Sequence, residues 1–439
     1  MANINVDFSK TVGKMKPVHG IGQPPIIGRN TSLFTYLSDA GIPYSRLHDV
    51  GGLFGGNCFV DLPNIFRDFD ADENEPSNYD FAYTDILINA LIENGVEPYF
   101  RLGVTIEETE VIAYRVYPPK DFAKWARICE HIIMHYTEGW SNGYHHKITY
   151  WEIWNEPDNS PDSPDSIIHN HMWQGKREEY YEFYTVVSKH LKERFPDLKI
   201  GGYGSCGFYT LHDGEKHGSD IANSSPRYEY FIIFFEGFLD YIKKANAPLD
   251  FFSWHNYRGY KGVDVYANYV RETLDKYGYT EAESSCNEWC TNLRIGTQGD
   301  IATRIFIEIL AYQNARVDNA MAYDGRCTGI DYAVLFNSET MRPRMSYYCF
   351  KDFNRLYKMK NQTEICSDDD RLFCISASDE KRGGVILINP TDAPIPLNII
   401  CDAKINTCYI TEEGMFDFDT QRMPKSISPK SFITVIFDL

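Results

Sequence analysis

Two segments, far apart in the sequence, each place a glutamate at the end of a run of residues typical of a buried strand. In the first, Tyr150–Asp158 (YWEIWNEPD), Asn155 and Glu156 follow aromatic and β-branched residues and precede a proline. In the second, Ser284–Trp289 (SSCNEW), small residues lead to Glu288 and a tryptophan. A carboxyl group in such surroundings loses solvation, which is costly unless the group has a task. Two carboxyls of this kind can cleave a glycosidic bond, one as general acid and the other as nucleophile.

Either segment alone is also compatible with an ordinary strand that ends in polar residues. The repetition of the pattern favours chemistry, because the C-terminal ends of the strands in a (β/α)8 barrel converge on one mouth. We interpret Glu156 as the general acid/base and Glu288 as the nucleophile. Asn155 is predicted to hydrogen-bond the sugar hydroxyl beside the anomeric carbon, where such a bond strengthens as positive charge develops on the ring.

The elements that must position these residues alternate between strand-like and helix-like from about residue 17 to about residue 340. The predicted strands are 17–20, 43–48, 97–102, 148–154, 198–203, 250–255, 284–288 and 319–323. The predicted helices between them are 31–40, 79–93, 121–136, 177–195, 228–245, 263–277 and 301–314. This order predicts an α/β fold, a (β/α)8 TIM barrel. A doubly wound fold is rejected, because Gly20–Pro25 has prolines where the first helix should begin.

The chain changes character near residue 355, where short strands separated by turns replace the alternation. These strands predict a smaller C-terminal β-sandwich domain. The predicted domains are a catalytic barrel at 13–350 and a β-sandwich accessory domain at 351–439, with residues 1–12 as a candidate further strand of the second domain.

Polar side chains at other predicted strand ends complete the candidate site. His255 ends the predicted strand at 250–255 and Tyr257 follows it, and either side chain beside Glu288 would hold its carboxylate ionised. His48 ends the strand at 43–48, and Asp324 follows the last strand, where it could bind sugar hydroxyls.

Histidines elsewhere receive a different interpretation. A lone histidine is more often hydrogen-bonded structure than catalyst, and only a place at a barrel strand end reverses that expectation. His19, at the predicted end of the first strand, is balanced between the two. The remaining histidines are interpreted as surface or structural: His131, His135, His145, His146, His169 and His171.

Composition excludes several classes of function. The chain has 439 residues and a formal net charge of −19, and no run of lysine and arginine stands out, so nucleic acid is not an expected partner. An acidic surface also disfavours heavily sulfated substrates. The 11 cysteines are scattered, and Cys286 and Cys290 lack companion ligands, so no metal and no cofactor are predicted.

The N-terminus has neither a basic nor an apolar targeting region, and no apolar run reaches the length of a membrane span. The sequence as it stands therefore predicts a cytoplasmic protein with no membrane partner. A signal peptide removed beforehand would make it periplasmic or secreted. The aromatic content of 15% suits stacking on sugar rings and is also compatible with a homo-oligomer.

The sequence resembles glycoside hydrolase family 39. This family belongs to the clan in which the acid/base residue ends strand four and the nucleophile ends strand seven. The resemblance rests on WEIWNEPD with NEW, and extends to Tyr44–His48, Trp173–Tyr181, Pro196–Gly202 and Asp250–Tyr257. It implies a retaining double displacement with a covalent glycosyl intermediate and carboxyls about 5–5.5 Å apart. It supports the following assignments: Glu156 as acid/base, Glu288 as nucleophile, and Asn155, His48, His255 and Tyr257 as sugar contacts.

The last strand departs from the family pattern. The β-xylosidases of the family carry a tryptophan and acidic residues there, whereas this chain has Met321–Cys327 (MAYDGRC) with Asp324 as the acidic candidate. An α-L-iduronide would need a cation for its carboxylate, and Arg326 and Arg258 are the candidates. The favoured function is a retaining exo-glycosidase acting on a terminal β-D-xyloside or related pentoside of a glycoside or oligosaccharide.

Three alternatives stay open at this stage. The same chemistry could act on an arabinoside, an α-L-iduronide or a galactoside. The barrel could bind carbohydrate without cleaving it, or the enzyme could act within a chain. Long segments at 104–120 and 159–175 favour a walled pocket and exo action.

Overall fold

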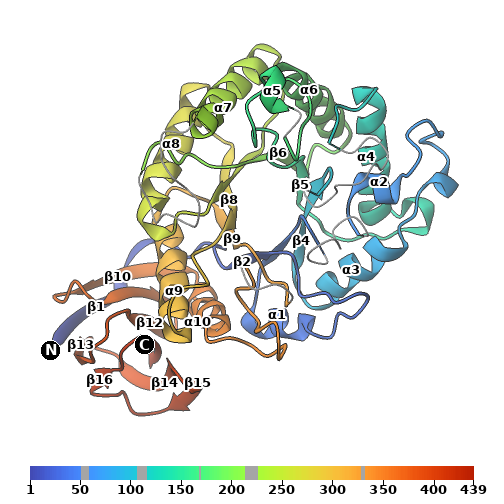
Figure 1. Ribbon diagram of the computed structural model, residues 1–439. Helices are drawn as coiled ribbons and strands as arrows, with labels where there is room; N and C mark the ends of the chain where they lie inside the picture. The colour runs from blue at the N-terminus through green and yellow to red at the C-terminus, as the bar shows by residue number, and fades with distance from the viewer. Residues whose placement is uncertain (51–58, 106–115, 168–169, 213–225, 328–331) are drawn as a thin grey trace.

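The chain folds as a closed eight-stranded parallel barrel surrounded by helices, with a sheet domain at one side that contains both termini (Figure 1). The computed structural model describes residues 1–50, 59–105, 116–167, 170–212, 226–327 and 332–439. The predicted fold class is therefore confirmed.

The barrel strands follow one another around the ring in chain order. They are β2 (Gly20–Gly22), β3 (Tyr44–Leu47), β4 (Glu97–Leu102), β5 (Tyr150–Ile153), β6 (Lys199–Ser205), β7 (Phe251–Asn256), β8 (Glu283–Trp289) and β9 (Asn319–Ala322). The principal helices are α1 (Phe34–Ala40), α3 (Ala82–Glu93), α4 (Phe122–Thr137), α6 (Arg177–Arg194), α7 (Pro226–Lys244), α8 (Val263–Lys276), α9 (Gln298–Asn314) and α10 (Tyr347–Tyr357). Two single-turn helices, α2 (Leu62–Ile65) and α5 (Pro164–Ile167), lie in the loops after β3 and β5. Short 3-10 turns are η2 (Pro76–Asn78), η3 (Trp140–Asn142) and η4 (Tyr260–Gly262).

The interior of the barrel is filled in layers, because every second side chain of a strand points inward. The layer nearest the N-terminal ends is aromatic, with Tyr99, Tyr150 and Phe251 in contact from three different strands. The next inward positions along these strands and their neighbours are polar. The barrel is thus closed by apolar side chains at one end and carries its polar groups toward the other.

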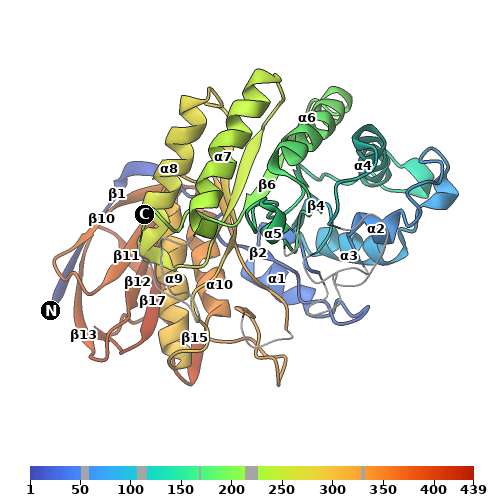
Figure 2. The ribbon, with the colours of Figure 1, turned by 45° about the horizontal axis from the view of Figure 1, so that its top comes forward.

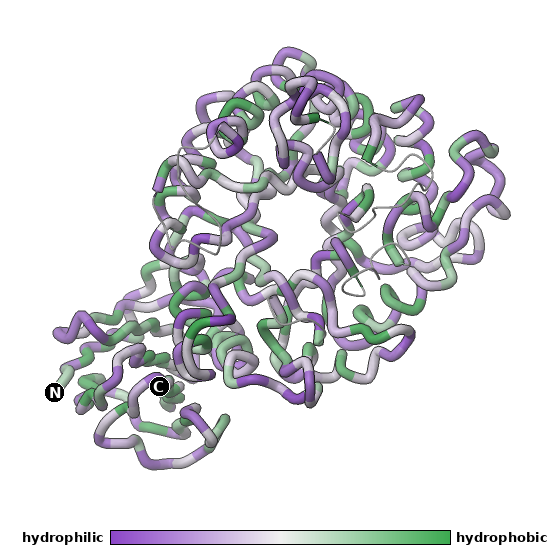
Figure 3. Tube along the Cα trace, in the orientation of Figure 1, coloured by the Kyte–Doolittle hydropathy of each residue, from purple (hydrophilic) through white to green (hydrophobic). Residues whose placement is uncertain are grey.

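The helices form the outer ring because each has an apolar stripe on the strands and a polar face to solvent. Hydrophilic and hydrophobic residues accordingly alternate along them (Figure 3). Their starts are encoded locally: Asp121 caps α4 by accepting from the Lys124 N–H at 2.9 Å, and Thr297 with Asp300 forms a capping box at α9. None of the helices described is long and apolar enough to cross a lipid bilayer.

The second domain is a nine-stranded sheet that folds around its own core. In order across the sheet it contains β15 (Met415–Thr420), β14 (Lys404–Glu412), β17 (Ser431–Asp438), β12 (Arg382–Asn389), β11 (Phe373–Ser378), β10 (Asn361–Ser367), β1 (Ala2–Lys14), β13 (Ile395–Ile400) and β16 (Ser426–Ile427). The N-terminal strand β1 pairs with β10 and β13 as the seventh strand of this order, so both ends of the chain are tied into one domain.

Alternation along the strands explains how this domain attaches to the barrel. In β17, Val435 faces the core of the sheet domain, whereas Phe432 and Ile436 join the core of the barrel. Figure 2 shows the sheet beside α9 and α10, which contact β12 and β17. Asp352 of α10 is fully buried and accepts a hydrogen bond from Thr434 of β17 at 2.8 Å. The predicted boundary at 350/351 falls inside α10, one of the two helices that contact the sheet domain.

The first strand differs from the prediction. It spans Gly20–Gly22 instead of 17–20, so His19 precedes the strand and does not end it. Its ring lies against Phe353 and Tyr357 of α10, and burial lowers the pKa of His19 to about 3. His19 is therefore a neutral packing residue between barrel and α10. The segment 159–175 and the segment 104–120, on which the prediction of a walled pocket rested, lie partly outside the described residues.

Candidate active site

The two glutamates singled out by the sequence lie at the C-terminal ends of β5 and β8. Glu288 is the penultimate residue of β8, and Glu156 follows β5 by three residues. The chain turns sharply there, with positive φ at Trp154 (73°) and Glu156 (44°). The Glu156 N–H donates to the carbonyls of Tyr203 and Gly204 at 3.1 and 3.0 Å. These bonds to β6 hold Glu156 at the mouth in spite of its unfavourable backbone conformation.

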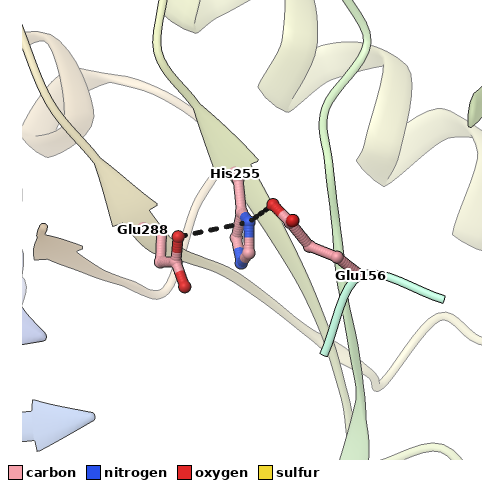
Figure 4. A group of neighbouring side chains, drawn as sticks. All are labelled: Glu156, His255 and Glu288. Carbon is pink, nitrogen blue, oxygen red and sulfur yellow. Dashed lines mark hydrogen bonds and ion pairs between the residues drawn. The ribbon is translucent and has the colours of Figure 1, made fainter. Parts of the chain in front are cut away.

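His255, near the end of β7, lies between the two carboxylates (Figure 4). Its Nδ1 is 2.7 Å from Oε1 of Glu156 and 3.5 Å from Oε2 of Glu288. One carboxylate oxygen of each glutamate and a ring nitrogen of His255 all lie within 4.8 Å of one another. Two carboxyls that are far apart in sequence thus face the same small volume.

Glu288 is held by two donors. The Tyr257 hydroxyl donates to Oε2 at 2.6 Å, and Nη1 of Arg46 donates to Oε1 at 2.5 Å. The side chain of Glu288 is only 5% exposed. Donors of this kind favour the ionised form of a carboxyl, and they fix its orientation.

Arg46, on β3, is the centre of a buried ionic network. Besides Glu288, its guanidinium donates to Oε2 of Glu152 and to Oδ1 of Asn155, both at 2.6 Å. Glu152 also accepts from Ser253 at 2.6 Å and from Asn287 at 2.7 Å, so its charge is fully bonded. One arginine therefore links the carboxamide beside the candidate acid to the candidate nucleophile.

The other oxygen of Glu156 faces the loop that follows it. Oε2 accepts from Nδ2 of Asn159 at 2.9 Å. Asp158 is turned away and accepts from the Ser205 hydroxyl at 2.7 Å, and burial raises the pKa of Asp158 to about 6. Asp158 thus ties the β5 loop to β6.

Electrostatics couple the three central groups. Burial raises the pKa of Glu156, but the hydrogen bond and charge of His255 outweigh it, and the pKa lies below its ordinary value. Burial raises the pKa of Glu288 above its ordinary value, against His255 and Arg46. Burial lowers the pKa of His255, and the charges of Glu288 and Glu156 reverse this and raise it. The opposite shifts of His255 and Glu156 favour an ion pair between the two, whose Nδ1 and Oε1 atoms lie 2.7 Å apart.

A second polar group lines the ends of β3 and β9. His48 lies 3.3 Å from Asp49, and burial together with nearby Arg101 and Arg46 lowers the pKa of His48 well below its ordinary value. The Tyr323 hydroxyl donates to Asp49 at 2.9 Å and accepts from Gln23 at 2.6 Å. These groups suit the recognition of hydroxyls by neutral donors and acceptors.

Asp324 and Arg326 pair with each other at 2.8 Å, and Asp324 is fully buried. Burial raises the pKa of Asp324 to about 7 despite the charge of Arg326. Arg258 is buried against the rings of Tyr209 and Tyr228. Of the two arginines considered for a substrate carboxylate, one is thus held by a carboxylate already and the other by aromatic rings.

The trio Glu156, His255 and Glu288 also has donor atoms close enough together for a metal ion. His255 already hydrogen-bonds Glu156 at 2.7 Å, and Arg46 supplies a positive charge to Glu288 at 2.5 Å. The chemistry of this donor set is that of a hydrogen-bonded acid–base cluster.

Removal of Arg46 is expected to destabilise the fold as well as the site. Arg46→Gln would leave the buried carboxylates of Glu152 and Glu288 without their cation, and breaking a buried pair in this way costs about 3–5 kcal/mol. Urea unfolding would measure this loss. The double variant Arg46→Gln/Glu152→Gln should recover part of it, because one uncompensated charge is then absent. As a matched control, Arg371→Gln removes an exposed arginine from the sheet domain and should leave unfolding unchanged. Equal stability of Arg46→Gln and the wild type would contradict the network.

Asp324 predicts a pH dependence of stability. Its carboxyl ionises near pH 3.8 when unfolded and near pH 7 when folded, so the folded state holds a proton that the unfolded state releases. The free energy of unfolding of the wild type therefore falls as the pH rises from about 3.8 to about 7. Asp324→Asn has no carboxyl to titrate, so this fall is absent. Its free energy of unfolding relative to that of the wild type should increase between pH 5 and pH 8, as measured by urea unfolding. The exposed control Asp402→Asn should run parallel to the wild type, and a parallel curve for Asp324→Asn would overturn the prediction.

Several residues of the site were not among the sequence-predicted ones: Arg46, Glu152, Asn159, Asp49, Gln23 and Tyr323. Two of them had a usable signal. Arg46 and Glu152 are charged residues in the middle of otherwise buried strands, two positions beyond the inward-facing Tyr44 and Tyr150. A period of two places both side chains inside the barrel, where opposite charges must pair.

The family of this chain is decided by a match to the family model for glycosyl hydrolases family 39, which extends from residue 30 to residue 283. That is more than half of the sequence. The chain belongs to glycosyl hydrolase family 39. The resemblance predicted from the motifs is thereby confirmed.

Individual relatives of this family 39 protein are distant. A curated β-xylosidase of Geobacillus stearothermophilus is 24% identical over 212 residues, which are 46% of this chain and 35% of that enzyme. The chain therefore aligns with about a third of the length of this curated relative. A glucosidase structure from Croceicoccus marinus superposes with a TM-score of 0.78 at 19% identity, covering 100% of this chain and 99% of that one. A monomeric β-xylosidase structure from Caulobacter crescentus CB15 gives 0.68 at 14% identity, with 99% of each chain covered. At these identities the structures establish the shared fold.

Proposed function

We propose that this protein is a retaining exo-glycosidase that hydrolyses terminal glycosides by double displacement, with a β-D-xyloside or related pentoside as the favoured glycone. The observation that carries the proposal is the approach of the Glu156 and Glu288 carboxylate oxygens to within 4.8 Å of each other. Retaining enzymes have carboxyls about 5–5.5 Å apart, whereas inverting enzymes leave about 6.5–9.5 Å for a water molecule. The family membership and the likeness to a β-xylosidase support the same chemistry.

In the first step, an oxygen of Glu288 attacks the anomeric carbon while the bond to the leaving oxygen breaks. Arg46 and Tyr257 hold Glu288 in place and keep it ionised at this moment. Glu156 gives its proton to the leaving oxygen. The glycosyl ester formed on Glu288 no longer carries the negative charge of the carboxylate.

The proton that Glu156 donates has a source in the structure. Nδ1 of His255 lies 2.7 Å from Oε1 of Glu156 and the pKa of His255 is raised, so a proton held by His255 and shifted along this hydrogen bond converts Glu156 into an acid. In the second step, Glu156 takes a proton from water as the water attacks the glycosyl ester, and Glu288 is released. In the free enzyme the pKa of Glu156 is lowered and that of Glu288 is raised. This order is compatible with Glu156 as the acid, because His255 and Glu156 share one proton.

The test is a panel of aryl glycosides: β-D-xyloside, α-L-arabinopyranoside, α-L-iduronide, β-D-galactoside and β-D-glucoside. Turnover of one of them, lost in Glu288→Gln, supports hydrolysis and identifies the glycone. Proton NMR of the first-formed sugar then reports its configuration, and an inverted product contradicts double displacement. Binding without turnover across the panel and across natural oligosaccharides would favour a carbohydrate-binding barrel instead. The homo-oligomer remains a prediction, which sedimentation of the purified protein tests.

A further inference from the structure

Another arginine, Arg227, lies near the candidate acid and takes no part in the network around Arg46. Arg227 stands at the start of α7, where its side chain is exposed. Its Nε donates to the main-chain oxygen of Asn159 at 2.7 Å, and its guanidinium lies 5.3 Å from the centre of the Phe231 ring. The side chain is thus held by one hydrogen bond and one aromatic face.

Arg227 is connected to Glu156 by a short path. Asn159, whose carbonyl anchors Arg227, uses its own side-chain amide to bond Oε2 of Glu156 at 2.9 Å. Oε1 of Glu156 faces His255 instead. Arg227 is therefore linked to the acid carboxylate through Asn159, whereas Glu288 is linked to it through His255. In the proposed reaction Glu156 protonates the leaving oxygen. The leaving group of the substrate therefore lies on the side of Glu156 that faces away from Glu288.

Among the residues that the structure describes, no carboxylate forms an ion pair with Arg227. Arg46 has two carboxylates within 2.6 Å and Arg326 has Asp324 at 2.8 Å, but no carboxylate lies within 4 Å of Arg227 in the described ranges. Its remaining N–H groups have no acceptor there. The net charge of −19 does not remove this local field, because screening limits exposed charges to roughly 8–10 Å.

We propose that Arg227 binds a carboxylate on the leaving-group part of the substrate, so that the protein prefers glycosides whose aglycone is an aromatic acid or a uronic acid. The inference rests on the proposed glycosidase function. A guanidinium recognises a carboxylate by two parallel N–H bonds, and beyond its anchored Nε Arg227 carries further N–H groups that bond no described residue.

A bound carboxylate would also favour the first chemical step. Arg227 is one of the positive charges that lower the pKa of Glu156. An anion on the guanidinium neutralises that charge, and the protonated form of Glu156 that donates to the leaving oxygen is then easier to reach. Substrate binding and acid catalysis would thus be coupled through one side chain.

The experiment compares two β-D-xylosides that differ in a single group, the 3-carboxyphenyl and the 3-carbamoylphenyl glycosides. The wild type is expected to show a kcat/KM about tenfold higher for the carboxylate, as a charge-assisted hydrogen bond provides. Arg227→Gln should remove the preference, so that the ratio of the two kcat/KM values falls to about one. Arg227→Lys should retain part of it. Arg371→Gln, which removes one positive charge at a distance, should behave as the wild type.

Binding separates a failure of this inference from a failure of the proposed function. Calorimetry on Glu288→Gln and on Glu288→Gln/Arg227→Gln, with the same two glycosides, requires no turnover. The subsite is supported if Glu288→Gln binds the carboxylate glycoside more tightly than the carboxamide and if this difference disappears in Glu288→Gln/Arg227→Gln. This result does not require that any xyloside is hydrolysed. Equal binding of both glycosides, or an equal effect of Arg227→Gln on both, overturns it.

Discussion

Glu288→Ala is expected to lower kcat/KM by at least about 10⁴-fold on every glycoside that the wild type hydrolyses, because no covalent intermediate can form without the nucleophile. The fold should survive the change, since Arg46 keeps its bonds to Glu152 and Asn155. Initial rates on the aryl glycoside identified in the panel measure the loss. Thermal unfolding of the variant, compared with the near-isosteric Glu288→Gln, shows whether the protein is intact.

The product formed with azide defines the role of Glu288 more sharply than the rate does. In Glu288→Ala the space left by the carboxylate admits azide, which attacks the anomeric carbon directly. The resulting glycosyl azide should have the configuration opposite to that of the substrate, and NMR distinguishes the two. If both the Ala and the Gln variants, free of contaminating glycosidase, kept activity at the wild-type level, Glu288 would be excluded as the nucleophile.

Glu156→Ala is expected to lower kcat by roughly 10²–10⁴-fold for glycosides with poor leaving groups, which is the range that general acid–base catalysis contributes. A 2,4-dinitrophenyl glycoside needs little protonation, so its first step should be nearly unaffected and the glycosyl intermediate should accumulate. Azide should then restore turnover, because the second step lacks only its general base. The pre-steady-state burst and the azide dependence of kcat measure both effects.

The configuration of this second azide product is the complement of the first. In Glu156→Ala the glycosyl ester on Glu288 still forms, and azide displaces it, so the product should have the same configuration as the substrate. If the two variants gave the reverse pair of configurations, the roles of Glu156 and Glu288 would be exchanged. This outcome matters because burial raises the pKa of Glu288 in the free enzyme, while His255 lowers that of Glu156. Asn159→Ala is a useful control, since it removes a hydrogen bond from Glu156 without removing either carboxyl.

The sequence determined the architecture, because the alternation of strands and helices is written in local periodicity and each strand is short. The one misplaced strand, Gly20–Gly22, is a three-residue element whose glycines carry no apolar pattern. The strand-end positions of Glu156, Glu288, His255 and Tyr257 also followed from local pattern. Proline after Glu156 and tryptophan after Glu288 mark where the buried stretches stop.

Only the tertiary structure decided how these side chains are connected. Arg46 on β3 bonds Glu152 and Asn155 at the end of β5 and Glu288 on β8. These three places in the sequence are separated by about a hundred residues or more, so no local pattern records the network. The place of His255 between the two carboxylates sets their pKa order, and that order depends on distances of 2.7 and 3.5 Å across the barrel mouth. Closure of the barrel brings these groups into one low-dielectric volume, and it is there that charge and burial acquire their effect.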